Sequence, residues 1–191
     1  MSHFSFRRLV PVVGVLLFLS VSISFYVLSP DKILGALGVE NAYLLMFLLA
    51  FLGGLSTFSG VPYHIVLIAL AGSGLNPWLL GVLAACGVTA GDSTSYLLGR
   101  RGSELLSSRM RAMLGRLASL EERSPRLVSV VIFLYGALMP FSNDLLVIPA
   151  GMLGYPFLRV MTLLGVGNIL FNVGLALLAV QAGGFLAGFL S

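Results

Sequence analysis

The stretch Leu138-Met-Pro-Phe-Ser-Asn-Asp-Leu-Leu-Val-Ile-Pro-Ala-Gly151 places Asp144 in a polar, proline-containing break between two apolar runs. These runs, Leu127–Met139 and Leu145–Tyr155, hold 13 and 11 residues, whereas a helix needs about 20 residues to cross a bilayer. The pattern therefore predicts a re-entrant hairpin whose polar tip lies inside the membrane. Broken backbone at that depth is tolerated only where it packs in protein or lines a wet cavity. A carboxylate there marks a functional site by default.

The composition predicts an all-α integral membrane protein rather than a soluble domain. The chain is 58% hydrophobic and only 9% charged, with a mean hydropathy of +1.04, which is far above the range of soluble proteins. The single cysteine, Cys86, excludes an internal disulfide. The net charge of +4 arises in residues 100–126, where membrane topology explains it, so we expect no nucleic-acid partner.

The first apolar run, Leu9–Leu28, follows Arg7-Arg8. A cleaved signal peptide is one interpretation, but the run is long for that purpose and Phe25–Ser29 is a poor cleavage site. We favour an uncleaved transmembrane helix within an N-terminal unit, residues 1–40.

The rest of the chain divides into apolar segments with polar interruptions. The first predicted hairpin, residues 41–75, is interrupted at Gly53-Gly54 and again at Ser59–Pro62. The predicted membrane domain spans residues 41–183 and is followed by a tail, residues 184–191. Its remaining parts are a transmembrane helix at 77–99, a loop at 100–126, a second hairpin at 127–156 and a transmembrane helix at 157–183.

The loop holds seven arginines, so the positive-inside rule predicts that it and the N-terminus are cytoplasmic. Apolar residues at helical spacing within it predict an amphipathic helix on the membrane surface: Leu106, Met110, Met113, Leu117 and Leu120. A surface-seated linker between repeats is favoured over a partner-binding or regulatory helix.

Two halves of the chain share an order of features. Ala71-Gly72 and Pro77-Trp78 recur as Ala150-Gly151 and Pro156-Phe157 with an offset of 79, and Pro62 corresponds to Pro140 with an offset of 78. With an odd number of crossings between them, the pattern predicts an inverted-topology repeat, which places a site at the midplane.

Asp92 is the only charged residue of the predicted span 77–99, and Tyr96 can share its helix face one turn later. On the repeat offset this patch corresponds to the region of Asn168 and Asn172. Such groups can serve as polar contacts between helices. A buried acid is a poor choice for that role, so a functional role is favoured.

At the second tip, Ser142 or Asn143 can cap the helix that begins near Asp144. The free N–H groups of such a terminus suit an anionic head group. Burial favours a protonated Asp144, whereas the helix dipole favours its carboxylate. We therefore consider a proton-dependent switch alongside a permanently ionised cap.

His64 occupies the repeat position of Asn143. A His–Asp contact across the tips and a structural, hydrogen-bonded histidine are both consistent with this position. With two histidines in the chain, we expect neither a metal nor a cofactor. Ser59, His64 and Asp92 lack a nucleophile motif, so we expect no catalytic residues and no enzyme.

The segment Gly91-Asp-Ser-Thr-Ser-Tyr-Leu-Leu-Gly-Arg-Arg-Gly102 resembles the Gly-Asp-x-x-x-Tyr-x-x-Gly-Arg-x-x-Gly signature of the DedA family, also called the SNARE-associated Golgi protein or VTT-domain family. Pro140–Leu146 and Pro149-Ala-Gly151 resemble its second hairpin. The resemblance implies two opposed re-entrant hairpins and movement of lipids between leaflets. The chain differs from bacterial members at Ala137 and Asn143, where arginines are usual.

These patterns together predict a lipid translocase, a flippase or scramblase, of the cell membrane that moves a phosphate-bearing lipid. A proton-coupled transporter of a small solute and a non-transporting assembly factor are the alternatives. We expect anionic lipid head groups as partners, and the small residues permit a homodimer. The expected roles are proton coupling by Asp92 and Asp144, a substrate path along His64, Ser142, Asn143, Tyr96, Arg100 and Arg101, and hairpin breaks at Pro62, Pro140 and Pro149.

Overall fold

A computed structural model describes residues 35, 38–55, 63–102, 119, 123–139 and 142–190, and these residues form six helices. The predicted N-terminal helix, the amphipathic helix of the loop, Pro62 and Pro140 lie outside the described residues. The helices are α3 (Val39–Leu55), α4 (Tyr63–Gly72), α5 (Pro77–Gly102), α7 (Pro125–Leu138), α8 (Asp144–Met152) and α9 (Phe157–Leu190).

One helix in this described part is long and apolar enough to cross a membrane by length and composition, at Phe157–Ala182 within α9. The helices α3, α4 and α7 are shorter and apolar. Together with α8 they form two pairs of short helices, α3–α4 and α7–α8, at the positions of the predicted hairpins; we call the helices of each pair its first and second arm. The bounds differ at two places, because α3 begins before Asn41 and α5 continues through Arg100 and Arg101.

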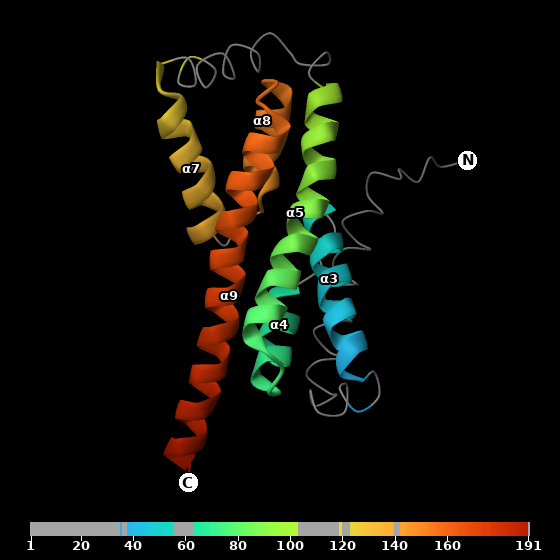
Figure 1. The fold of residues 1–191 in the computed structure, drawn as a ribbon, viewed down its shortest axis with the longest axis vertical. Helices are drawn as coiled ribbons and strands as arrows, with labels where there is room; N and C mark the ends of the chain where they lie inside the picture. Colours follow the sequence, from blue (N-terminus) through green and yellow to red (C-terminus); the bar gives the residue numbers. More distant parts are fainter. Residues whose placement is uncertain are drawn as a thin grey trace, which may run out of the picture.

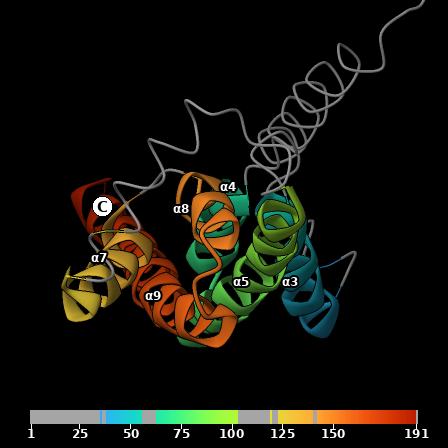
Figure 2. The same ribbon diagram turned by 90° about the horizontal axis from the view of Figure 1, so that it is seen from above.

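The two halves are arranged in opposite directions. The long helices α5 and α9 run antiparallel, with the pair α3–α4 toward one end of the molecule and the pair α7–α8 toward the other (Figure 1). The first arm of each pair packs on the long helix of its own half, α3 on α5 and α7 on α9. The second arms are exchanged, so that α4 packs on α9 and α8 on α5. Viewed along the long axis, α4 and α8 lie on one side of the α5–α9 pair (Figure 2).

The same turn ends both second arms. The φ angles are +88° at Gly74 and +72° at Gly154, values that residues other than glycine rarely adopt. Glycine adopts this left-handed region without a steric penalty and commonly ends helices there. After α8, the Gly154 N–H donates to the Gly151 carbonyl and the Tyr155 N–H donates to the Ala150 carbonyl, both at 3.0 Å. Because each turn precedes a proline-led long helix, the two halves share a local structure as well as an order of features.

Matching contacts of the two long helices locate the symmetry axis. In the folded chain the halves correspond with an offset of 80 residues, since α5 begins at Pro77 and α9 at Phe157, and the turn glycines are Gly74 and Gly154. Gly81 of α5 lies against Val173 of α9, and the equivalent pair, Met161 and Ser93, is also in contact. The two-fold axis therefore passes between α5 and α9, in the region where the Asn168 amide donates to the Thr89 hydroxyl at 3.0 Å.

Two predicted helix breaks are wrong. Gly53-Gly54 does not interrupt α3; a Cβ atom on Gly54 would overlap with the Val88 carbonyl of α5, so this glycine permits close helix packing. Pro149 lies inside α8 rather than ending it. Proline removes one backbone donor but is tolerated in membrane helices when neighbouring groups satisfy the backbone.

Glycines also bring the exchanged arm α8 against α5. Cβ atoms at Gly99 and Gly151 would overlap with the carbonyls of Ile148 and Tyr96, respectively. Backbone contact across this interface fixes the depth of α8 along α5, and therefore the position of its polar N-terminus opposite the middle of α5.

Candidate functional site

The site is built around Asp92, which is 2% exposed on α5. The side-chain amide of Asn143, just before α8, donates to Asp92 Oδ2 at 2.7 Å. Asn143 therefore connects the polar tip of the second pair of arms to the only acid on α5.

The cluster continues onto α9 through two further amides. Asn143 Nδ2 also lies 3.3 Å from Asn168 Oδ1, and Asn168 Nδ2 donates to Thr89. Asn172 Nδ2 donates to the Asn168 backbone carbonyl at 2.8 Å. The Asn172 side chain is 1% exposed, and its Oδ1 accepts no hydrogen bond within the described part of the chain. These contacts confirm the common interior predicted for the patches on α5 and α9.

Ser142, not Asn143, caps the start of α8. The Asp144 backbone N–H donates to Ser142 Oγ at 3.2 Å, and Asn143 makes no capping bond because its amide is directed to Asp92 and Asn168. The Tyr135 hydroxyl of α7 donates to the Ser142 carbonyl at 2.9 Å. Ser142 therefore joins both arms of the second pair at their polar end.

Asp144 is 8% exposed and its charge acts on Asp92. The other groups that act on Asp92 are the amides of Asn143 and Asn168. The hydroxyls of Tyr63 on α4 and Tyr135 on α7 are close enough to be affected by the charge of Asp92. Elements of both halves thus place neutral polar groups around Asp92, with Asp144 nearby, an arrangement suited to holding a proton or contacting a polar head group.

His64 lies outside this cluster. It is half-buried, its ring centroid is 5.6 Å from that of Phe171 on α9, and it also stacks against Tyr63 at 3.9 Å. With the offset of 80 residues, the equivalents of Asn143 and Asp92 are Tyr63 and Asn172 rather than His64 and Phe171. The side chains of Tyr63 and Asn172 are also hydrogen-bonded, so a polar contact joins the start of each second arm to a long helix. The hypothesis of a His64–Asp144 contact is replaced by the ring contact with Phe171.

Three other predicted path residues also lie outside the cluster. Tyr96 is fully buried, and its hydroxyl donates to the Tyr155 carbonyl while its ring packs edge-on against Phe157. Tyr96 therefore holds the α8–α9 connection. Arg100 and Arg101 are exposed in the last turn of α5, about 12 Å of helix rise from Asp92.

Sequence analysis missed Arg159 and Thr89. The Arg159 side chain on α9 donates to the Ser129 hydroxyl at 2.6 and 3.0 Å and to the Pro125 carbonyl, which ties the start of α7 to α9. A single arginine near the start of an apolar span carried no pattern. A single threonine in the apolar span of α5 carried no pattern either.

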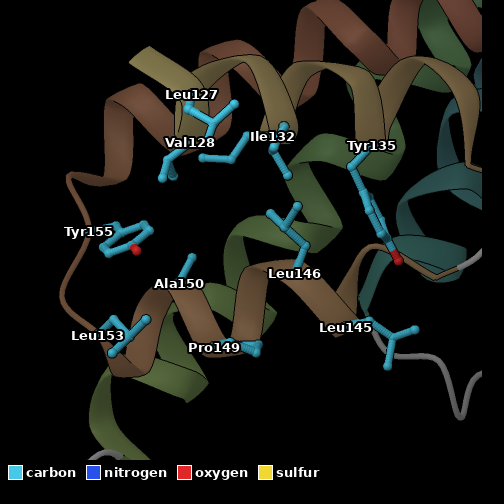
Figure 3. Close-up of a pocket in the computed structure, with 11 residues that line it drawn as sticks. Leu127, Val128, Ile132, Tyr135, Leu145, Leu146, Pro149, Ala150, Leu153 and Tyr155 are labelled. Atoms are coloured by element: carbon cyan, nitrogen blue, oxygen red, sulfur yellow. The ribbon is translucent and has the colours of Figure 1, made fainter. Parts of the chain in front are cut away.

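An apolar groove lies between α7 and α8, with a cavity volume of about 290 Å³ (Figure 3). Figure 3 shows side chains of both arms directed into it, among them Ile132 from α7 and Leu146 from α8. Its inner end is formed by Tyr135 and Leu145, beside the polar cluster. Its outer end is formed by Leu127, Val128, Leu153 and Tyr155.

The fold, the apolar span of α9 and the buried polar cluster define an all-helical membrane protein. The family model of the VTT domain matches residues 61–189, more than half of the chain. The protein therefore belongs to the VTT-domain family, the DedA/SNARE-associated Golgi protein family, which confirms the resemblance of its Gly91–Gly102 segment. Members of this family are generally not catalytic enzymes. No curated protein and no solved structure matches the chain significantly.

Proposed function

We propose that this protein moves an amphiphilic, phosphate-bearing lipid such as a phospholipid or a polyprenyl phosphate between membrane leaflets. The observation that carries the proposal is the hydrogen-bonded cluster of Asp92, Asn143 and Asn168, buried where the two halves meet. Buried acids and amides at the meeting point of discontinuous helices are typical of transport pathways.

The groove between α7 and α8 favours a lipid over a soluble solute. A lipid path must open sideways to the bilayer so that the chains stay in an apolar medium, whereas a solute path is closed around its cargo. The groove is lined by apolar side chains on both arms and reaches the polar cluster at its inner end. Head group and chain would therefore meet different surfaces of one site.

In this proposal the pairs α3–α4 and α7–α8 are re-entrant hairpins that enter the membrane from opposite faces, within a membrane domain of residues 41–183. Each helix of these pairs is shorter than the about 20 residues that span a bilayer. The N-terminus and residues 100–126 face the cytoplasm of a cell membrane. The expectation of a homodimer stays open to test.

The path in this proposal runs along Ser142, Asn143 and Asp92, with Arg100 and Arg101 attracting anionic head groups at its mouth. Asp92 and Asp144 provide proton dependence. Tyr63, Tyr135 and the amides of Asn143 and Asn168 are the described polar groups that face Asp92 from the neighbouring elements.

Lipid exchange in proteoliposomes tests the function. Purified protein is reconstituted with a trace of fluorescent phosphatidylglycerol or polyprenyl phosphate, and a membrane-impermeant reagent quenches the outer leaflet. Quenching beyond half of the label, faster than in protein-free liposomes, is the expected result. Liposomes that show no exchange of either lipid, together with counterflow of a small solute, would establish the transporter alternative instead.

A separate measurement tests whether lipid exchange depends on protonation of Asp144. If Asp144 takes up a proton during transport, the Asp144→Asn protein exchanges lipid at a rate that no longer varies with pH, while it unfolds at the wild-type temperature. A folded Asp144→Asn protein that keeps the wild-type pH profile would exclude this role for Asp144.

A further inference from the structure

The second pair of arms is open where the first is closed. Helices α3 and α4 pack against each other, and Met46, Val66 and Leu67 between them and their neighbours are fully buried. Helices α7 and α8 diverge instead and leave the apolar groove between them. Because the halves are repeats, an open pair of arms is not required by the fold. Among the described residues, α3 and α4 are in contact, whereas α7 and α8 are separated by the groove.

The polar cluster around Asp92 lies beside the open pair, α7 and α8. Asn143, which contacts the buried acid Asp92, immediately precedes α8, whereas the equivalent contact in the first half, between Tyr63 and Asn172, contains no acid. The Tyr135 side chain connects the two features, since it lines the groove and its hydroxyl donates to Ser142. The groove and the polar cluster are therefore two ends of one continuous surface.

The groove has the depth of one leaflet. Its lining extends from Leu127 to Tyr135 on α7 and from Leu145 to Leu153 on α8, which corresponds to about 12 Å of helix rise on each arm. Half of a hydrocarbon core of about 30 Å is about 15 Å. An alkyl chain that enters from the bilayer surface would end beside the polar cluster.

The outer end of the groove lies at the positively charged end of the molecule. The end of α5, the start of α7, the end of α8 and the start of α9 gather there (Figure 1). Arg100 and Arg101 end α5, Arg126 lies in the first turn of α7, and Arg159 donates to Pro125 and Ser129. This charge complements an anionic head group whose chain lies in the groove.

We propose that the groove between α7 and α8 is a binding site for one alkyl chain of an anionic lipid, with the head group at the Arg100–Arg159 end. The inference rests on the proposed lipid translocation and specifies where the lipid is held before its head group reaches Asp92. It makes the two halves unequal, because one half binds the chain while the other serves as a closed support.

Photolabelling in nanodiscs tests the site. The probe is a phosphatidylglycerol with a diazirine in one chain, and adducts are mapped by mass spectrometry. Adducts are expected on groove residues of α7 and α8 in excess over the bilayer-facing Leu44, Leu48 and Leu52 of α3, which are 56%, 46% and 43% exposed. Excess unlabelled lipid should remove the groove adducts and leave the α3 adducts. Equal, non-saturable labelling of both surfaces would overturn the site.

Two neighbouring valines provide a matched pair of variants. Val131 lines the groove and is 51% exposed, whereas Val130 does not line it and is 50% exposed. Val131→Trp is expected to reduce groove adducts about fivefold, equivalent to about 1 kcal/mol of binding, and Val130→Trp to leave them unchanged. Equal effects of the two substitutions would contradict the proposal.

Two further comparisons test the preference for an anionic head group and distinguish chain binding from lipid transport. A phosphatidylcholine probe with the same chain should label the groove less than phosphatidylglycerol; equal labelling would overturn the anionic preference. Because adducts report binding rather than transport, saturable groove labelling supports the chain site even in a protein without lipid exchange. Failed exchange would then count against the proposed function alone.

Discussion

At the scale of single residues, Asn143 forms the side-chain contacts that connect the start of α8 to both long helices. Its amide donates to Asp92 on α5 and lies 3.3 Å from Asn168 Oδ1 on α9, so one side chain contacts both long helices. It does so from a position where most of the neighbouring chain is apolar. A change at Asn143 therefore alters the surroundings of a buried acid without touching a helix interior.

We predict that Asn143→Ala slows lipid exchange by about tenfold, a change of about 1.4 kcal/mol in barrier height. The substitution leaves Asp92 without its 2.7 Å donor. His64→Ala is the control, because it removes a ring contact between α4 and Phe171 of α9 without touching Asp92, and it should retain most of the exchange. Both rates are measured in proteoliposomes with proteins of confirmed thermal stability. Equal losses in the two variants would contradict a one-sided site.

The residue types of the site could be predicted from sequence, but not most of their contacts. Asp92, Ser142, Asn143 and Asp144 were recognised because polar groups are rare in such an apolar chain. The pairing of Asn143 with Asp92 bridges 51 positions, and only the packing of α8 on α5 determines it. Tyr96 was misplaced because sharing a helix face with Asp92 does not fix where a long side chain ends.

At the scale of elements, glycines set the packing of α8 against α5. Gly151 on α8 meets the Tyr96 carbonyl so closely that a Cβ atom has no room, whereas a Cβ atom on Gly72, in the last turn of α4, would have nothing within 4 Å. The contact with α5 therefore requires glycine at position 151, while no neighbour requires it at position 72.

We predict that Gly151→Ala destabilises the protein by about 1–3 kcal/mol, the usual cost of overpacking. Gly72→Ala should be neutral or slightly stabilising, because alanine favours the helix and meets no neighbour. Thermal unfolding in detergent micelles compares the two. Loss of stability in Gly72→Ala equal to that in Gly151→Ala would show that helix propensity, and not the α5–α8 contact, is responsible.

The sequence predicts helix positions well where segment lengths and prolines mark them clearly. It predicts them poorly where a glycine or proline can either end a helix or lie within one. The pairs of short arms and the span of α9 occur near the predicted residues. Gly53-Gly54 and Pro149 were taken as breaks. Gly54 instead permits contact with Val88, and Pro149 is accommodated within α8. Local sequence does not distinguish these uses, because a neighbouring helix decides between them.

At the scale of the whole molecule, the inverted arrangement explains why the site lies midway along the helices. Two halves that point in opposite directions are related by an axis that passes between α5 and α9, and the paired contacts Gly81–Val173 and Ser93–Met161 place this axis near Asp92. The repeat was visible from sequence as an offset of 79 residues. The exchange of α4 and α8 between halves was not, because no local pattern encodes it.

Cysteine labelling tests the proposed orientation. We predict that Ser73→Cys, in the turn after α4, and Met152→Cys, at the end of α8, react with an impermeant maleimide from opposite faces of the membrane. Cys86 is replaced by serine in both proteins so that each carries one thiol. The reagent applied to intact cells should label position 73 only, with position 152 labelled after the membrane is opened. Labelling of both positions from one face would exclude the inverted arrangement.

The central claim is that the buried cluster around Asp92 lies on the path of a translocated lipid. The most direct measurement is the lipid-exchange rate of the Asp92→Asn protein in proteoliposomes, relative to wild type, at equal protein density and with its fold confirmed by thermal unfolding. We predict wild-type exchange well above that of empty liposomes and a reduction of about tenfold or more in the variant. A folded Asp92→Asn protein that exchanges lipid at the wild-type rate would contradict the claim.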